Sequence, residues 1–180
     1  GNGEDVFVMS NGHISPVFYS VLARSGYFPV DELNTFRLLN TRLQGHPTTH
    51  EGLPGVRVAT GSLGQGLSVA VGFALQKKLD GDNSRVFALT GDGELQEGQI
   101  WEALMFAAHH KVDNLIVAVD FNQQQIDGST GDVMGITEVK SRFASFGWIT
   151  LEMDGNDWED IHHLLPNAIN QLGCEKPVVI

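Results

Sequence analysis

The sequence has very little of three things that often define a protein class: cysteine, long apolar runs and basic residues. A single cysteine, Cys174, excludes an intrachain disulfide framework and suits a reducing compartment. No apolar run approaches the roughly 20 residues that cross a bilayer, and the N-terminus lacks the layout of a signal peptide. We therefore expect a soluble protein located in the cytoplasm.

Basic residues are scarce, since 11 Lys and Arg stand against 22 Asp and Glu and leave a formal net charge of −11. A chain this acidic repels phosphate backbones and anionic lipid surfaces, so neither nucleic acid nor a membrane is an expected partner. Its 180 residues suffice for a sizeable core, and one domain over residues 1–180 is the simplest organisation.

Apolar, β-favouring runs alternate along the chain with segments of helical periodicity. Strands are predicted at residues 5–10, 86–89, 115–119, 148–153 and 176–180. Helices are predicted at residues 15–24, 32–39, 67–78, 97–111, 137–146 and 158–172, with Ser15 and Asp31 as N-caps of the first two. From residue 86 on, strands recur about every thirty residues, the period of repeated βαβ units. This pattern predicts an α/β fold with a parallel sheet and helices on both faces.

A Gly-Asp-Gly turn at residues 91–93 directly follows one predicted strand, and Asn122 follows the next. Because neighbouring parallel strands end at the same edge of a sheet, Asp92 and Asn122 can converge there. Two hard oxygen ligands, free glycine amides and a helix start are typical of a site where Mg²⁺ or Ca²⁺ holds a diphosphate. Alternatively, the triplet is an ordinary turn and Asn122 a loop residue.

The sequence of this region resembles that of transketolases, most of all the N-terminal section of transketolases split over two chains. The resemblance rests on the motif GDGELQEGQIWEA, on Asn122 and on Ile-Asp-Gly at residues 126–128. The resemblance covers nearly the whole chain and implies a three-layer thiamine diphosphate-binding fold. It also implies two cofactors, thiamine diphosphate and Mg²⁺ or Ca²⁺. The implied metal ligands are Asp92, Asn122 and the carbonyl of Gln124, and the implied cofactor contacts are Gly61, Leu63, Gly91, Asp92, Gly93, Asn122 and Ile126.

The resemblance also implies four candidate catalytic residues. His13, in Ser-Asn-Gly-His, and His46, in Gly-His-Pro, match family histidines that reach cofactor and substrate. Glu97 and Glu102 match glutamates at the subunit interface that help link the two active sites of a dimer. Without the resemblance, a histidine after a turn is more often structural, and helix glutamates are more often solvated.

A glycine-rich segment, Gly-Ser-Leu-Gly-Gln-Gly at residues 61–66, directly precedes the helix predicted at 67–78. An alternative interpretation of this segment is a dinucleotide-binding loop. Its glycines follow the order G-x-x-G-x-G, whereas that fingerprint is G-x-G-x-x-G, and the acidic ribose partner is not in place. The resemblance instead assigns its backbone, at Gly61 and Leu63, to the aminopyrimidine ring of the cofactor. The loop before it, residues 40–57, is long enough to be functional.

The resemblance implies a transferase that moves a two-carbon ketol unit between sugar phosphates: a thiazolium ylid attacks a ketose carbonyl, a C–C bond breaks, and the carbanion adds to an aldose. It also implies truncation at both ends, and half a site, because the glutamate that activates the cofactor lies in the family's pyrimidine-binding domain. A complementary subunit or domain, in a homodimer or heterotetramer, is therefore expected. The alternatives are another thiamine diphosphate enzyme, such as a deoxyxylulose-phosphate synthase or a 2-oxo acid dehydrogenase component, and a non-catalytic cofactor-binding partner.

Overall fold

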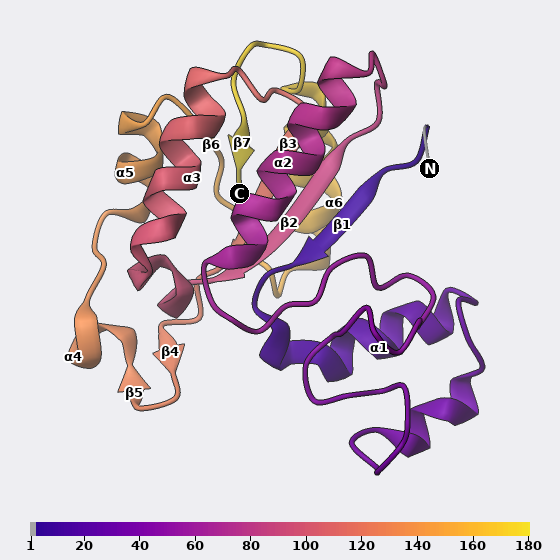
Figure 1. Cartoon of the computed structure of the whole chain (residues 1–180). Helices are drawn as coiled ribbons and strands as arrows, with labels where there is room; N and C mark the ends of the chain where they lie inside the picture. Colours follow the sequence, from indigo (N-terminus) through magenta and orange to yellow (C-terminus); the bar gives the residue numbers. More distant parts are fainter. Residues whose placement is uncertain (1–2) are drawn as a thin grey trace.

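The computed structural model describes residues 3–180 and is built around a five-stranded sheet (Figure 1). All neighbouring strands are parallel, in the order β1-β2-β3-β7-β6. The strands are β1 (Val6–Met9), β2 (Val86–Gly91), β3 (Leu115–Asp120), β6 (Ile149–Thr150) and β7 (Val178–Val179). The predicted α/β fold with a parallel sheet is confirmed, although β6 and β7 are shorter than predicted.

Helices cover both faces of the sheet, which gives three layers (Figure 1). They are α1 (Ser15–Arg24), α2 (Gln65–Leu79), α3 (Gly98–His109), α4 (Thr130–Met134), α5 (Val139–Ser145) and α6 (Trp158–Asn170). On one face α2, α3 and α5 bury the larger core, which includes Leu67, Val117 and Phe143. On the other face Ile116 and Val178 pack against α6. None of the helices within residues 3–180 is long and apolar enough to cross a membrane.

A lobe beyond the end of β1 contains α1 and the chain that follows it (Figure 1). Its small core joins Tyr19 and Leu22 of α1 to Phe28, Leu43 and Leu53. Between residues 36 and 64 the chain forms neither helix nor strand. This loop is longer than predicted, and its packing on α1 holds it in place.

The helix predicted at residues 32–39 is wrong. A 3-10 helix, Val30–Thr35, takes part of that stretch, and the chain then reverses through Arg37, whose φ is +58°. Leu33 and Phe36 pack against the small core beside α1, but Leu39, the third apolar position at helical spacing, is 90% exposed. The predicted caps also differ, because Asp31 lies inside the 3-10 helix and Ser15 is the first residue of α1.

A small unit follows β3 where only a turn and a loop were expected. Two short antiparallel strands, β4 (Gln124–Gln125) and β5 (Gly128–Ser129), form a hairpin that leads into α4 (Figure 1). The hydroxyl of Ser129 caps α4 by accepting a hydrogen bond from the Asp132 amide. A Cβ atom at Gly93 would lie 3.3 Å from the Cβ of Gln125, so the hairpin packs closely on the Gly-Asp-Gly turn.

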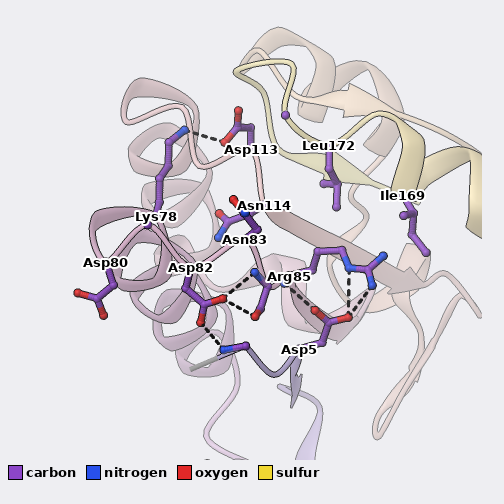
Figure 2. Close-up of a pocket in the computed structure, with 14 residues that line it drawn as sticks. Asp5, Lys78, Asp80, Asp82, Asn83, Arg85, Asp113, Asn114, Ile169 and Leu172 are labelled. Carbon is purple, nitrogen blue, oxygen red and sulfur yellow. Dashed lines mark hydrogen bonds and ion pairs between the residues drawn. The ribbon is translucent and has the colours of Figure 1, made fainter. Parts of the chain in front are cut away.

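An open pocket of about 1050 Å³ lies at the amino end of the sheet, with ion pairs beside it (Figure 2). The pairs are Arg85 with Asp5, Lys77 with Asp82 and Lys78 with Asp113, at 2.9, 3.0 and 2.6 Å. Hydrogen bonds from Ser84, from the Gly3 amide and from Lys77 hold the pKa of Asp82 well below its usual range. Each of these three carboxylates therefore has a cationic partner.

Candidate functional site

The residues singled out in the sequence gather at the opposite edge, where β1, β2 and β3 end. A pocket of about 400 Å³ lies there, and separate segments of the chain line it. The predicted residues among its lining are His13, His46, Gly61, Leu63, Gly91, Asp92, Gly93, Glu97, Asn122, Gln124 and Ile126. The structure therefore brings together every predicted site residue except Glu102.

Glu102 lies on the exposed side of α3, away from the pocket. Met105 and Phe106 of the same helix are 51% and 44% exposed, although both are large and apolar. The placement of Glu102 at a subunit interface stays a prediction, and the exposed apolar surface of its helix is compatible with it.

Asp92 is the most buried of the predicted ligands, with 5% of its surface exposed. Its carboxylate accepts hydrogen bonds from the amides of Gly93 and Gln123, at 2.8 and 2.7 Å, and a longer one from the Thr130 hydroxyl at 3.5 Å. These bonds join the turn after β2 to the loop after β3. A carboxylate has about four lone-pair positions, so Asp92 keeps capacity for a further partner.

Asn122 lies in the exposed loop after β3, and Gln124 is the first residue of β4. The side-chain amide of Asn122 donates to Asp120 at 3.0 Å, and its oxygen accepts from the Gln124 amide at 2.8 Å. These neighbours fix the orientation of the Asn122 side chain while leaving its oxygen a second lone pair. Among residues 3–180 no three His, Cys, Asp or Glu residues form a metal-binding group, so a cation here would need amide and carbonyl oxygens as ligands.

A second buried carboxylate, Glu94, lies in the pocket wall and is only 2% exposed. It is not among the site residues predicted from the sequence. One of its oxygens, Oε1, accepts from the Gly64 amide at 2.7 Å and from the Ser10 hydroxyl. The other, Oε2, accepts from the Gly91 amide at 3.2 Å. No sequence signal marks this glutamate, because an acidic residue near a helix start is ordinarily exposed and favoured by the helix dipole.

Neither Asp92 nor Glu94 pairs with a basic side chain anywhere in the part of the chain that the structure describes. The same pocket wall contains the side-chain oxygen of Asn11, which is buried and has no hydrogen-bond partner within residues 3–180. Buried carboxylates without a counter-ion suit a divalent cation, and a buried acceptor without a partner suits a ligand donor. The donor set at this edge of the sheet therefore fits a metal with an anionic cofactor.

Helix α1 positions both candidate histidines. His13 lies in the 3-10 turn Gly12–Ile14, directly before α1, and His46 lies in the long loop that packs on that helix. The Ser15 hydroxyl donates to the Gly45 carbonyl at 2.7 Å, and the Tyr19 hydroxyl donates to the Gln44 carbonyl at 3.0 Å. Burial raises the pKa of Tyr19 to about 12, so its hydroxyl remains a donor at neutral pH.

In the glycine-rich segment before α2, the backbone lies very close to neighbouring loops. Gly61 has a φ of +124°, and a Cβ atom there would lie 2.5 Å from Cδ2 of His46. A Cβ atom at Gly12 would lie 2.6 Å from the backbone nitrogen of Gly61. Side chains at these two glycines would push the loops apart, so the glycines let the loops carrying His13 and His46 meet.

Comparison with known proteins decides the family. A family model described as the thiamine diphosphate binding domain of transketolase matches residues 2–180. The chain belongs to the transketolase family. Over 153 residues it is 42% identical to one of the subunits of the apulose-4-phosphate transketolase of Actinobacillus succinogenes, a match that covers 85% of this chain and 55% of that protein.

Other transketolase relatives agree in sequence and in structure. The 6-deoxy-6-sulfo-D-fructose transketolase subunit SqwG of Clostridium sp. (strain MSTE9) is 39% identical over 176 residues, covering 98% of this chain and 63% of that protein. The crystal structure of transketolase from Campylobacter jejuni superposes with a TM-score of 0.87 at 36% identity, covering 98% of this chain and 28% of the other. The predicted transketolase fold is confirmed, and the chain spans less than two thirds of each of these relatives.

Proposed function

We propose that the chain supplies the diphosphate-binding half of a transketolase that transfers a two-carbon ketol unit between sugar phosphates, using thiamine diphosphate and a divalent metal. The observation that carries the proposal is the pocket at the carboxyl end of the sheet. There the buried carboxylate of Asp92 has no basic partner in residues 3–180, in a chain whose family binds thiamine diphosphate.

In this proposal Asp92, Asn122 and the Gln124 carbonyl hold Mg²⁺ or Ca²⁺, which in turn holds the diphosphate. All three offer the hard oxygen ligands that these cations prefer. The support is their position in one pocket and the hydrogen bonds that orient Asp92 and Asn122. Glu94 is not assigned to the metal, because its carboxylate binds Ser10, Gly64 and Gly91, whereas Asp92 binds the loop after β3 that carries the other two proposed ligands.

Thiamine diphosphate, when bound, supplies the thiazolium carbon that makes a C–C bond next to a carbonyl breakable. The chain's own residues bind it and handle protons around it. Leu63 and Ile126 line the pocket with 37% and 102% of their surface exposed, so they can cover an apolar ring at its rim. His13 and His46 also line the pocket, where an imidazole can hold or move a proton at a substrate oxygen near neutral pH.

The proposal requires a second half, a pyrimidine-binding subunit or domain that carries the activating glutamate. The relative from Actinobacillus succinogenes is named as one of the subunits of its transketolase, and this chain spans 55% of it. Glu97 at the pocket and Glu102 on α3 are proposed to face that second half or a second copy of this chain. Exposed Met105 and Phe106 beside Glu102 would be covered in such an interface.

The test is to assay ketol transfer by this chain alone and after mixing with its complementary half. We expect activity only in the mixture, because an open half-site leaves nothing to position the thiazolium ring. Substantial transfer by the isolated chain would contradict the half-site proposal.

The substrate is tested in the same mixture with a panel of sugars. The two relatives named as subunits carry the names of different sugars, apulose 4-phosphate and 6-deoxy-6-sulfo-D-fructose, so both belong in the panel with ordinary ketose phosphates. Condensation of a 2-oxo acid in place of ketol transfer would favour the alternative thiamine diphosphate classes.

A further inference from the structure

We propose that Glu94 is a positioning residue for the cofactor, acting through a clamp made of Glu94, Ser10, Gly64 and Gly91. Its buried carboxylate joins the ends of β1 and β2 to the glycine loop before α2 and thereby fixes the walls of the pocket. The inference rests on the proposed function for the identity of the ligand, whereas the clamp itself is a feature of the described residues.

The clamp joins three segments that are distant in sequence. Ser10 directly follows β1 and donates its hydroxyl hydrogen to Oε1 of Glu94. Gly64, directly before α2, donates its amide hydrogen to the same oxygen at 2.7 Å. Gly91, the last residue of β2, donates to Oε2 at 3.2 Å. One side chain therefore sets the spacing of two strand ends and a helix start.

Only a carboxylate satisfies all three donors. An apolar side chain would leave them without acceptors in a buried place, where each unpaired polar group is costly. A glutamine offers one oxygen and one amide group. Its oxygen can accept from Ser10 and Gly64, but its amide group then faces the Gly91 amide, donor against donor. The glutamine variant thus breaks the Gly91 contact selectively.

The segments held by the clamp carry the candidate cofactor contacts. Gly61 and Leu63 lie in the loop that ends at Gly64, and the turn with Asp92 follows Gly91 directly. The start of α2 packs tightly against the end of β1, because a Cβ atom at Gly66 would lie 2.4 Å from the Ser10 hydroxyl oxygen. A shift of about 1 Å in such groups can weaken function by about 100-fold. The clamp is therefore placed to control affinity for the cofactor as well as stability.

The experiment compares Glu94→Gln with Asp82→Asn in the assembled protein, this chain together with its complementary half. Asp82 is a matched control because it is also a hydrogen-bonded carboxylate that joins chain segments, but at the amino end of the sheet. The readouts are the Kd for thiamine diphosphate at saturating Mg²⁺, the Tm, and amide hydrogen exchange in peptides covering Gly64 and Gly91 without cofactor.

Glu94→Gln is expected to raise the Kd by about tenfold or more, and to speed exchange at Gly91 more than at Gly64. Asp82→Asn is expected to lower the Tm while leaving the Kd within about twofold, because distant sites act independently. An unchanged Kd in Glu94→Gln would overturn the proposal. So would an equal rise of the Kd in both variants, since that would reflect general loss of stability.

A second variant keeps the proposal testable if Glu94→Gln does not fold. Ser10→Ala removes one donor of the clamp and leaves the carboxylate in place, so a smaller rise of the Kd, about threefold, is expected. An unchanged Kd in folded Ser10→Ala would then overturn the proposal. Failure of the wild-type assembly to bind thiamine diphosphate would instead refute the proposed function, and the inference with it.

Discussion

The carboxylates at the two ends of the parallel sheet differ in burial and in their basic partners. At the amino end Asp5, Asp82 and Asp113 each contact an Arg or Lys side chain at 2.6 to 3.0 Å. Figure 2 shows the pairs of Asp5 with Arg85 and of Asp113 with Lys78. At the carboxyl end Asp92 and Glu94 are more deeply buried, at 5% and 2% exposed. Within residues 3–180 neither has a basic partner.

This difference distinguishes ion pairs that stabilise the fold, at the amino end, from carboxylates that are available to a ligand, at the carboxyl end. A buried charge that lacks a counter-ion is costly, and the chain carries two such charges where the strands end. The carboxyl ends of the strands in open α/β sheets are also where ligands bind. At the amino end each of these three carboxylates has an Arg or Lys partner, whereas at the carboxyl end Asp92 and Glu94 have none within residues 3–180, which is compatible with the proposed cation site.

The largest effect is expected from the same substitution, Asp to Asn, made at both ends of the sheet. Asp92→Asn in the assembled enzyme is expected to lower ketol transfer by about 100-fold or more, because it removes the only charge among the proposed metal ligands. The Tm of the unliganded protein should fall by only a few degrees, because the loss of a buried charge without a counter-ion offsets part of the cost of setting the Asn amide group against the Gly93 or Gln123 amide. Steady-state assays and thermal melts measure both effects, with Asp82→Asn as control, and wild-type activity in Asp92→Asn would exclude the metal role.

Alanine at His13 or His46 is expected to lower activity by about 100-fold, the usual size of a lost proton-transfer group. Both imidazoles line the pocket and neither is buried, so the Tm should stay nearly unchanged. His50→Ala is the control, because His50 is exposed in the same loop as His46 but does not line the pocket. A large loss of Tm with normal turnover would assign the two histidines a structural role instead.

The smallest expected effect concerns the amino end. Because the pKa of Asp82 is depressed in the folded protein, its contribution to stability is present above its unfolded pKa of about 4 and is lost as the pH falls below that value. Asp82→Asn should lower the Tm by several degrees at pH 7 and flatten the fall of Tm below pH 4. Melts across pH measure this, with Asp80→Asn as an exposed control. An unaltered pH dependence would show that the hydrogen bonds from Ser84, Gly3 and Lys77 to Asp82 add no stability.

Much of this site was predictable because it follows from strand order. Asp92 and Asn122 each follow an apolar run, and parallel neighbours must end at one edge, so their convergence needed no knowledge of side-chain packing. The positions of the histidines and of Gly61 came from resemblance alone, since nothing in their local sequence sets them apart from ordinary loop residues.

What could not be predicted depends on tertiary contacts. Glu94 looks like any acidic residue near a helix start, and only the meeting of Ser10, Gly64 and Gly91 buries it. The hairpin β4–β5 packs closely against Gly93, and its two-residue strands carry no periodic signal. The apolar spacing at residues 32–39 was misleading because the chain reverses at Arg37 before Leu39 can be buried.

The metal-binding role of Asp92 is tested most directly by titration with thiamine diphosphate, once with Mg²⁺ and once with the metal chelated. The proteins compared are the assembled wild type, Asp92→Asn and Asp82→Asn. We predict that wild type and Asp82→Asn bind tightly only with Mg²⁺, and that Asp92→Asn binds weakly under both conditions. Equal, metal-dependent affinity in all three proteins would show that the Asp92 carboxylate does not hold a metal.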